Sequence, residues 1–295
     1  MTKEMDKLIE ENRQLKLDVH RYQQDVLRYQ DELQKANVQL EGLIERLNKD
    51  VRTMQRLQQV LVPTEFPNIS GFEFSTKFIP SPISGGDYID IFQHENKFKF
   101  GVIMSSASGY GMSALMLSAF LNLTGQLEAR RGGQPDKMMK LIADDVLELV
   151  ENDDRSEVFY ALVDQRKFEL HYCLQGDINA FHWDSEKREL HLLNKTGESL
   201  SAGQEGPYKK EKVALNSKDR CIVCSPGLIE MKNIDDETYG LQRLMRSIRD
   251  NVEKPVHELR NEIIFQLEQF SQGVETKSDL SVIVAEVKEK VLKLA

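Results

Sequence analysis

Cys221 and Cys224 lie three positions apart, and two cysteines at this spacing can carry out chemistry together. A C-x-x-C pair can act as a redox couple or supply half of a zinc site. The segment DRCIVCSPG, however, predicts a short buried strand, and residues three apart on a strand face opposite sides of the sheet. No second ligand pair with suitable spacing occurs elsewhere, and three cysteines, counting Cys173, are too few and odd in number for a disulfide framework. We therefore expect small buried core residues here.

The composition limits what kind of protein can position such residues. The chain has 295 residues, a net charge of -9, 40% hydrophobic residues and 29% charged residues. The acidic balance argues against nucleic-acid binding, which needs clustered Lys and Arg. No apolar run is long enough to span a bilayer, and the first residues lack the apolar core of a signal peptide. We expect a cytoplasmic protein that binds neither nucleic acid nor membranes.

Residues 1–60 carry a seven-residue apolar repeat, contain no Pro and include a single Gly. Two registers three residues apart are the a and d positions of a coiled coil. A single helix would leave this long stripe in water, so the pattern predicts a parallel homodimer, with a polar residue at one a position to fix its register. The rod would be roughly 80 Å long. The residues predicted to dimerise are Asn12, Leu15, Val19, Tyr22, Val26, Tyr29, Leu33, Leu40, Leu43 and Leu47.

Residues 61–290 predict a separate α+β domain. The rod stops before Pro63, because proline disfavours helical geometry in the preceding residue. Short alternating apolar runs typical of strands follow, interrupted by two helical pairs, at 112–131 with 136–150 and at 240–252 with 255–270. A last strand is predicted in DLSVIVAEV. This order favours antiparallel sheets packed against helices.

Six segments after residue 60 resemble, in order, the SpoIIE/RsbU-type branch of the PPM (metal-dependent, type 2C) serine/threonine phosphatases. They are LQQVLVPTEFPNISGFEFSTKFIPSPISGGDYIDIF, SASGYGMSALMLSAFLNL, EVFYALVDQRKFELHYCLQGD, KVALNSKDRCIVCSPGLIE, YGLQRL and KSDLSVIVAEV. The resemblance implies a sandwich of two antiparallel β-sheets flanked by helices. It also implies a site between the sheets where two Mg²⁺ or Mn²⁺ ions activate a water for attack on a phosphoserine.

The resemblance places four anionic metal ligands in such a site, and this chain keeps one of them. Asp87 matches the Asp of G-G-D. The other three positions hold Ser106, Pro226 and Ser278, and Asp279 matches the neighbour of the last one. Serine is a weak neutral ligand, and proline offers no side-chain ligand. The loss of such ligands costs orders of magnitude in metal affinity or activity, so we expect no catalytic residues and no metal site.

Other acids could in principle replace the missing ligands. Asp90 lies three residues after Asp87 and should point to the opposite face of a regular strand. It also matches an Asp that the family carries in this motif. The pairs 153–154 and 235–236 lie in polar loops and should be solvated. We therefore expect no rescue of the site.

Two further departures from the family pattern lie near the expected site. Gly176-Asp177 stands where the family has Gly-His, and Tyr110 stands where it has His. With the lost ligands, these changes indicate that the whole site has been rebuilt. Asp87 is then interpreted as a turn or hydrogen-bonding residue, with residual binding of a single metal ion as the alternative.

Together these observations predict a catalytically inactive pseudophosphatase. It would act as a dimeric regulator that takes no cofactor and binds a protein partner, such as a component of a bacterial partner-switching pathway. Two alternatives stay open: an unusual Mg²⁺- or Mn²⁺-dependent phosphatase with residual activity, and a structural coiled-coil protein. By analogy with the family, the segment with Leu57 and Leu61 would act as a switch between rod and domain.

Overall fold

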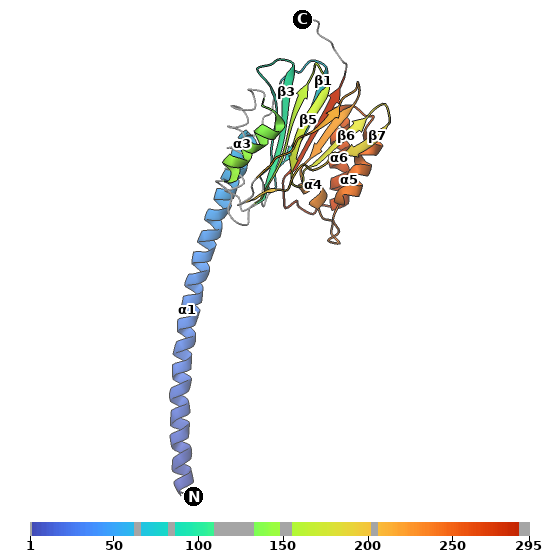
Figure 1. The fold of residues 1–295 in the computed structure, drawn as a ribbon. Helices are drawn as coiled ribbons and strands as arrows, with labels where there is room; N and C mark the ends of the chain where they lie inside the picture. Colours follow the sequence, from blue (N-terminus) through green and yellow to red (C-terminus); the bar gives the residue numbers. More distant parts are fainter. Residues whose placement is uncertain are drawn as a thin grey trace. The chain divides into compact units, whose positions relative to one another are not determined.

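A computed structural model describes residues 2–61, 66–81, 86–108, 133–147, 155–201 and 206–288. The chain divides into two units, Met1–Thr53 and Met54–Ala295. Figure 1 shows the elements in chain order. Tyr110, Asp153 and Asp154, and the predicted helix at 112–131, lie outside the described residues.

The N-terminal segment is one helix, α1 (Thr2–Leu61), about 90 Å long at the usual rise per residue. The absence of proline allows this continuous helix. The described side chains of its apolar repeat lie exposed in the single chain, from Met5 to Leu47. The side chains of Leu57 and Leu61 lie outside the described ones. The long helix is therefore confirmed, and its pairing stays a prediction.

The second unit contains two antiparallel sheets. The first has the strand order β1-β11-β10-β6-β7, and the second β2-β3-β4-β5-β9, with β8 paired to β4. The strands of the first sheet are β1 (Phe72–Ile79), β6 (Asn179–Asp184), β7 (Glu189–Leu192), β10 (Arg220–Cys224) and β11 (Leu280–Val287). Those of the second are β2 (Tyr88–Gln93), β3 (Lys99–Ser108), β4 (Arg155–Asp164), β5 (Glu169–Gln175), β8 (Leu200–Ser201) and β9 (Glu211–Ala214).

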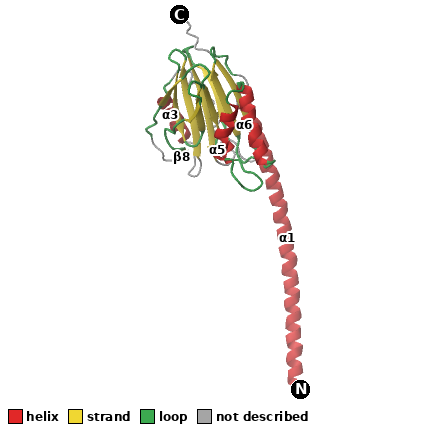
Figure 2. Ribbon diagram, turned by 90° about the vertical axis from the view of Figure 1, so that its right-hand side faces the viewer, coloured by secondary structure: helices red, strands yellow, loops and turns green. Residues whose placement is uncertain are grey.

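Helices cover the outer faces of both sheets, which gives the layer order helix, sheet, sheet, helix (Figure 2). The helices are α3 (Pro135–Leu147), α4 (Gly227–Glu230), α5 (Gly240–Asn251) and α6 (Val256–Ser271). α5 and α6 pack on the first sheet through Leu244, Ile248 and Leu259, and α3 packs on the second through Met138 and Ile142. The predicted α+β sandwich is therefore confirmed.

The largest apolar cluster fills the space between the sheets. Alternate residues of the longer strands enter it, for example Ile89 and Ile91 of β2. The C-x-x-C pair follows the same alternation. Cys221 packs toward this inter-sheet cluster, and Cys224 packs under α5 and α6. The expected opposite orientation of the two thiols is thus confirmed.

A buried ion pair joins the first sheet to its helices. Arg220 of β10 pairs with Glu286 of β11, and both side chains are buried. The Arg220 guanidinium also donates to the carbonyl oxygens of Val252 and Lys254, in the connection between α5 and α6. Lys288 completes the pairing of the Glu286 carboxylate at 2.9 Å. The charges are therefore compensated inside the fold, which burial requires.

Candidate functional site

Four positions form a row across the second sheet at one end of the sandwich. Ser106 of β3 lies opposite Glu157 of β4. The register of the flanking strands extends the row to Asp87, just before β2, and to Gly176, just after β5. All four share the strand parity of the residues in the inter-sheet cluster, so they face the first sheet. We call Asp87, Ser106, Glu157 and Gly176 the end row.

Two serines of the first sheet face this end. The Ser225 amide donates to the Ser281 carbonyl at 2.9 Å, and the Ser281 amide donates to the Ser225 hydroxyl at 3.0 Å. Both residues are fully buried. Residues 225 and 281 lie far apart in the sequence, and the pairing of β10 with β11 brings them together.

The Asp279 carboxylate links Ser81 to Asp87. One of its carboxylate oxygens accepts from the Ser81 amide at 2.7 Å, and the other accepts from the Asp87 amide at 3.1 Å. The residue is 1% exposed. Because both oxygens bind backbone amides, this carboxylate fixes the backbone that carries Asp87.

Asp87 has the most perturbed carboxyl group of the site. Its pKa is raised from 3.8 to about 7, chiefly by burial and also by the nearby Asp279 charge, while the nearby hydroxyls of Ser106, Ser281 and Ser225 oppose the rise. A carboxyl group in such surroundings exchanges its proton near neutral pH. Carboxyl and hydroxyl oxygens therefore converge from both sheets at this point.

Glu157 is a site residue that the sequence analysis missed. Its carboxylate accepts from the Asp177 amide at 2.7 Å and from the Ser199 hydroxyl at 2.8 Å. Burial raises its pKa, and these two hydrogen bonds oppose the rise. Gly176 has a φ of +79°, and a Cβ there would lie 1.3 Å from a Glu157 oxygen. The turn therefore needs glycine both for its backbone and for the space that Glu157 fills.

The remaining predicted positions lie around this centre. Pro226 is buried and precedes α4, and the hydroxyl of Ser225 beside it reaches the Asp279 carbonyl at 3.3 Å. Ser278 is half-buried next to Asp279. Asp177 is exposed and pairs with Lys195.

The acids considered as replacements do not join the end row. Asp90 accepts a hydrogen bond from the Tyr88 hydroxyl at 3.2 Å, and Tyr88 belongs to the cluster under α3. Asp90 therefore points to the opposite face from Asp87, as expected. Asp235 and Asp236 are exposed in the loop before α5, also as expected.

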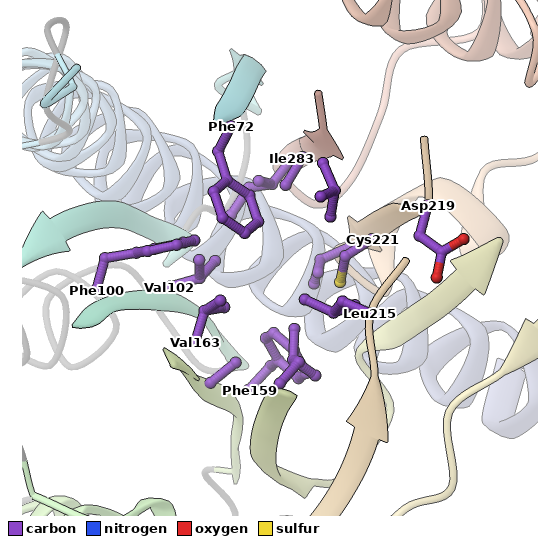
Figure 3. A pocket seen from close by; sticks show the side chains of 14 residues that line it. Phe72, Phe100, Val102, Phe159, Val163, Leu215, Asp219, Cys221 and Ile283 are labelled. Carbon is purple, nitrogen blue, oxygen red and sulfur yellow. The ribbon is translucent and has the colours of Figure 1, made fainter. Parts of the chain in front are cut away.

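The described residues enclose one cavity between the sheets and line an open pocket near them. An open pocket of about 190 Å³ lies between the α4 segment and residues 274–278, and Gly227 and Ser278 form part of its wall. A cavity of about 20 Å³ lies between the sheets, lined mainly by apolar side chains such as Phe100 and Phe159 (Figure 3). It has room for about one water and few polar partners for it, so we interpret it as a packing void. Among the described residues, the open pocket beside Ser278 is a concave surface that adjoins the site.

The donor set can be compared with what a divalent cation requires. Within the described ranges, no three His, Cys, Asp or Glu side chains gather as metal ligands. The convergent oxygens are the Asp87 carboxylate and the hydroxyls of Ser106, Ser225 and Ser281. Mg²⁺ can be bound through one or two carboxylates while it keeps several waters. These oxygens fit a single hydrated Mg²⁺ or Mn²⁺ better than a bridged pair.

Comparisons with solved structures support the fold. The SiaA PP2C domain of Pseudomonas aeruginosa superimposes with a TM-score of 0.67 at 12% identity, over 82% of this chain and 97% of that one. The RsbU and RsbW domains of a Mycobacterium tuberculosis protein give 0.65 at 14% identity, over 76% and 64%. The PP2C domain of Bacillus subtilis SpoIIE, with a fragment of its regulatory domain, gives 0.59 at 15% identity, over 73% and 63%. A comparison with curated protein sequences gives no significant match.

The expectation that the chain takes no cofactor is wrong. The structures that share its fold include PP2C-type phosphatases, which depend on Mg²⁺ or Mn²⁺. The expectation counted carboxylates at four positions. A deficit of carboxylates weakens the binding of two bridged ions, but hydroxyl oxygens and water remain as ligands for such hard cations.

The sequence itself also links the chain to a family. Residues 96–288 match the profile of the family described as Stage II sporulation protein E (SpoIIE). This match covers most of the domain that carries the end row. The chain therefore belongs to the SpoIIE family, and its second unit is a PP2C-type (PPM) phosphatase domain.

Proposed function

We propose that this protein is a dimeric regulator whose PP2C-type domain binds a protein partner and does not turn over phosphoesters. One observation carries the proposal. Of the four positions expected to hold anionic ligands, only Asp87 has a carboxylate, and Ser106, Pro226 and Ser278 are neutral. A bridged pair of ions supplies the activated water in two-metal hydrolases. One buried carboxyl group with a pKa of about 7 does not neutralise such a pair.

The phosphatase assay should use the full-length chain with p-nitrophenyl phosphate and a phosphoserine peptide, in Mg²⁺ or in Mn²⁺. We expect no turnover that a chelator removes. Chelator-sensitive turnover that is lost in Asp87→Asn would contradict the proposal and favour a phosphatase with residual activity. The Asp87→Asn variant is needed because it separates turnover by this site from turnover by a contaminant.

Dimerisation is the second part of the proposal, and the exposed apolar repeat of α1 supports it. In the single chain, Leu33 at an a position and Leu27 outside the repeat are 63% and 66% exposed. Only pairing would distinguish them, because an a-position side chain enters the seam between two helices. We expect sedimentation equilibrium to show a dimer for the wild type and Leu27→Lys, and a monomer for Leu33→Lys. A monomeric wild type, or equal behaviour of the two variants, would contradict pairing.

A protein partner in the cytoplasm is the third part. No described helix is long and apolar enough to cross a membrane. One structure of the same fold was solved with its RsbU and RsbW domains together, which is consistent with a role beside regulatory proteins. The open pocket beside Ser278 offers a concave surface next to the end row. The partner protein would bind at this part of the domain's surface.

The segment with Leu57 and Leu61 would couple the rod to this surface. It forms the C-terminal end of α1, where the sequence of the second unit begins. We expect Leu57→Asp with Leu61→Asp to change either dimerisation or partner binding. If both stay unchanged in sedimentation and binding experiments, this segment is not a switch.

A further inference from the structure

The outer face of α5 carries two exposed arginines that form no ion pair with the described residues of the domain. Leu244, Ser247 and Ile248 are buried against the first sheet, so the opposite side of the helix faces solvent. Arg246 and Arg249 are both exposed and lie three residues apart on this side. The two guanidinium groups can therefore be reached together by one short segment of another molecule.

Most of the domain's arginines that the structure describes form contacts within the fold. Arg243, one turn before Arg246, pairs with Glu237, donates to the Thr238 carbonyl at 2.8 Å and covers the Phe270 ring. Other arginines with partners are Arg155, Arg166, Arg188, Arg220 and Arg260. By contrast, Arg246 and Arg249 make no ion pair or side-chain hydrogen bond with any described residue.

The surroundings make this basic face unusual. Residues 1–60 contain 11 basic and 11 acidic residues, so the net charge of -9 falls entirely on the rest of the chain. On α5 the one exposed acid near the two arginines is Asp250, and it pairs with neither of them. Glu253, beyond the end of the helix, pairs with Arg188. The face therefore keeps a local positive charge on an acidic domain.

We propose that the outer face of α5, with Arg246 and Arg249, is a docking surface for a short acidic segment of a partner protein. Arginine suits this role because its planar fork can bind a carboxylate through two hydrogen bonds. A long polyanion such as nucleic acid, or an anionic bilayer, would meet the repulsion of the whole acidic domain. A short segment lies along the basic face alone. This inference rests on the proposed function, and it names the chemistry of the partner.

The test measures binding of a fluorescein-labelled oligoglutamate peptide to the full-length chain by anisotropy, at low and at physiological salt. We expect binding that weakens with salt and becomes about tenfold weaker in the double variant Arg246→Gln, Arg249→Gln. The matched control is Lys97→Gln with Lys167→Gln, which removes two exposed charges elsewhere on the domain. It should change the affinity less than about twofold.

Each other outcome overturns the assignment. An equal loss in the lysine control means that only total charge matters, and no binding by the wild type means that the face takes no acidic segment. Tighter binding of a DNA duplex or of phosphatidylserine vesicles through the same arginines assigns the face to another polyanion. Phosphatase turnover is measured on the same samples. Turnover with intact peptide binding refutes the proposed function alone, and peptide failure without turnover refutes this inference alone.

Discussion

Replacement of Asp87 by Asn should stabilise the domain at neutral pH and remove a pH dependence. The Asp87 carboxyl group has a pKa of about 7 in the fold, against 3.8 ordinarily. Between these values the folded protein holds a proton that the unfolded chain has released. The raised pKa therefore contributes stability that is present below about pH 4 and is lost as the pH rises through 7. The full span corresponds to about 4 kcal/mol, because each pH unit is worth about 1.4 kcal/mol.

The assay is urea unfolding of the wild type and Asp87→Asn in a buffer with a chelator. From about pH 5 to about pH 8, we expect the free energy of unfolding of the wild type to fall by about 2–3 kcal/mol relative to the variant. Asp235→Asn, at an exposed carboxylate, is the control and should follow the wild type. A difference between wild type and Asp87→Asn that does not change with pH would refute the reasoning.

The same two proteins also test whether a divalent cation binds at Asp87. Of the two carboxylates in the end row, Glu157 already accepts from the Asp177 amide and the Ser199 hydroxyl, whereas Asp87 lies near the serine hydroxyls. Mn²⁺ added at about pH 8 should therefore raise the stability of the wild type more than that of Asp87→Asn. Equal stabilisation of the two proteins would show that the cation binds elsewhere.

Three further predictions concern the structure around the site. Asp279→Ala removes the acceptor of two buried amides, so the free energy of unfolding in urea should fall by about 3–5 kcal/mol. A fall below about 1 kcal/mol would show that these two hydrogen bonds do not hold the backbone before β2. Arg220→Met leaves Glu286 buried with its pairing reduced to Lys288, and thermal unfolding should show a loss of about 3 kcal/mol; an unchanged midpoint would contradict this. Gly176→Ala should cost about 2 kcal/mol or more, and Glu157→Ala in the same chain should recover part of it, whereas strictly additive losses would show that the two residues do not compete for space.

The sequence predicted the strands and helices that follow a clear apolar period. The segments DRCIVCSPG and DLSVIVAEV contain β10 and β11, and the helices predicted at 240–252 and 255–270 lie within about a residue of α5 and α6. α4 and β8 were missed. They are short, and β8 exists through its pairing with Arg155 and Ser156 of β4, which no local pattern encodes.

The candidate site was predicted only in part. The resemblance located Asp87, Ser106, Pro226 and Ser278, but it could not show what surrounds them. Glu157 needed the register of β3 with β4, although a charged residue at an inward position of an apolar strand was a usable signal. The serines at 225 and 281 meet only through the pairing of distant strands. The cofactor prediction failed because charge counting ignores such neutral oxygen donors.

The separation of the end row from the apolar interior of the sandwich has a practical consequence for protein engineering. Apolar residues fill its middle and both outer faces, whereas the end row occupies a single level of side chains near one rim. Libraries that randomise only Asp87 and Ser106 of this level, and keep Gly176 with Glu157, would leave the packed interior and the glycine turn untouched. The scaffold can thus be offered new ligands or reactions at little risk to its folding.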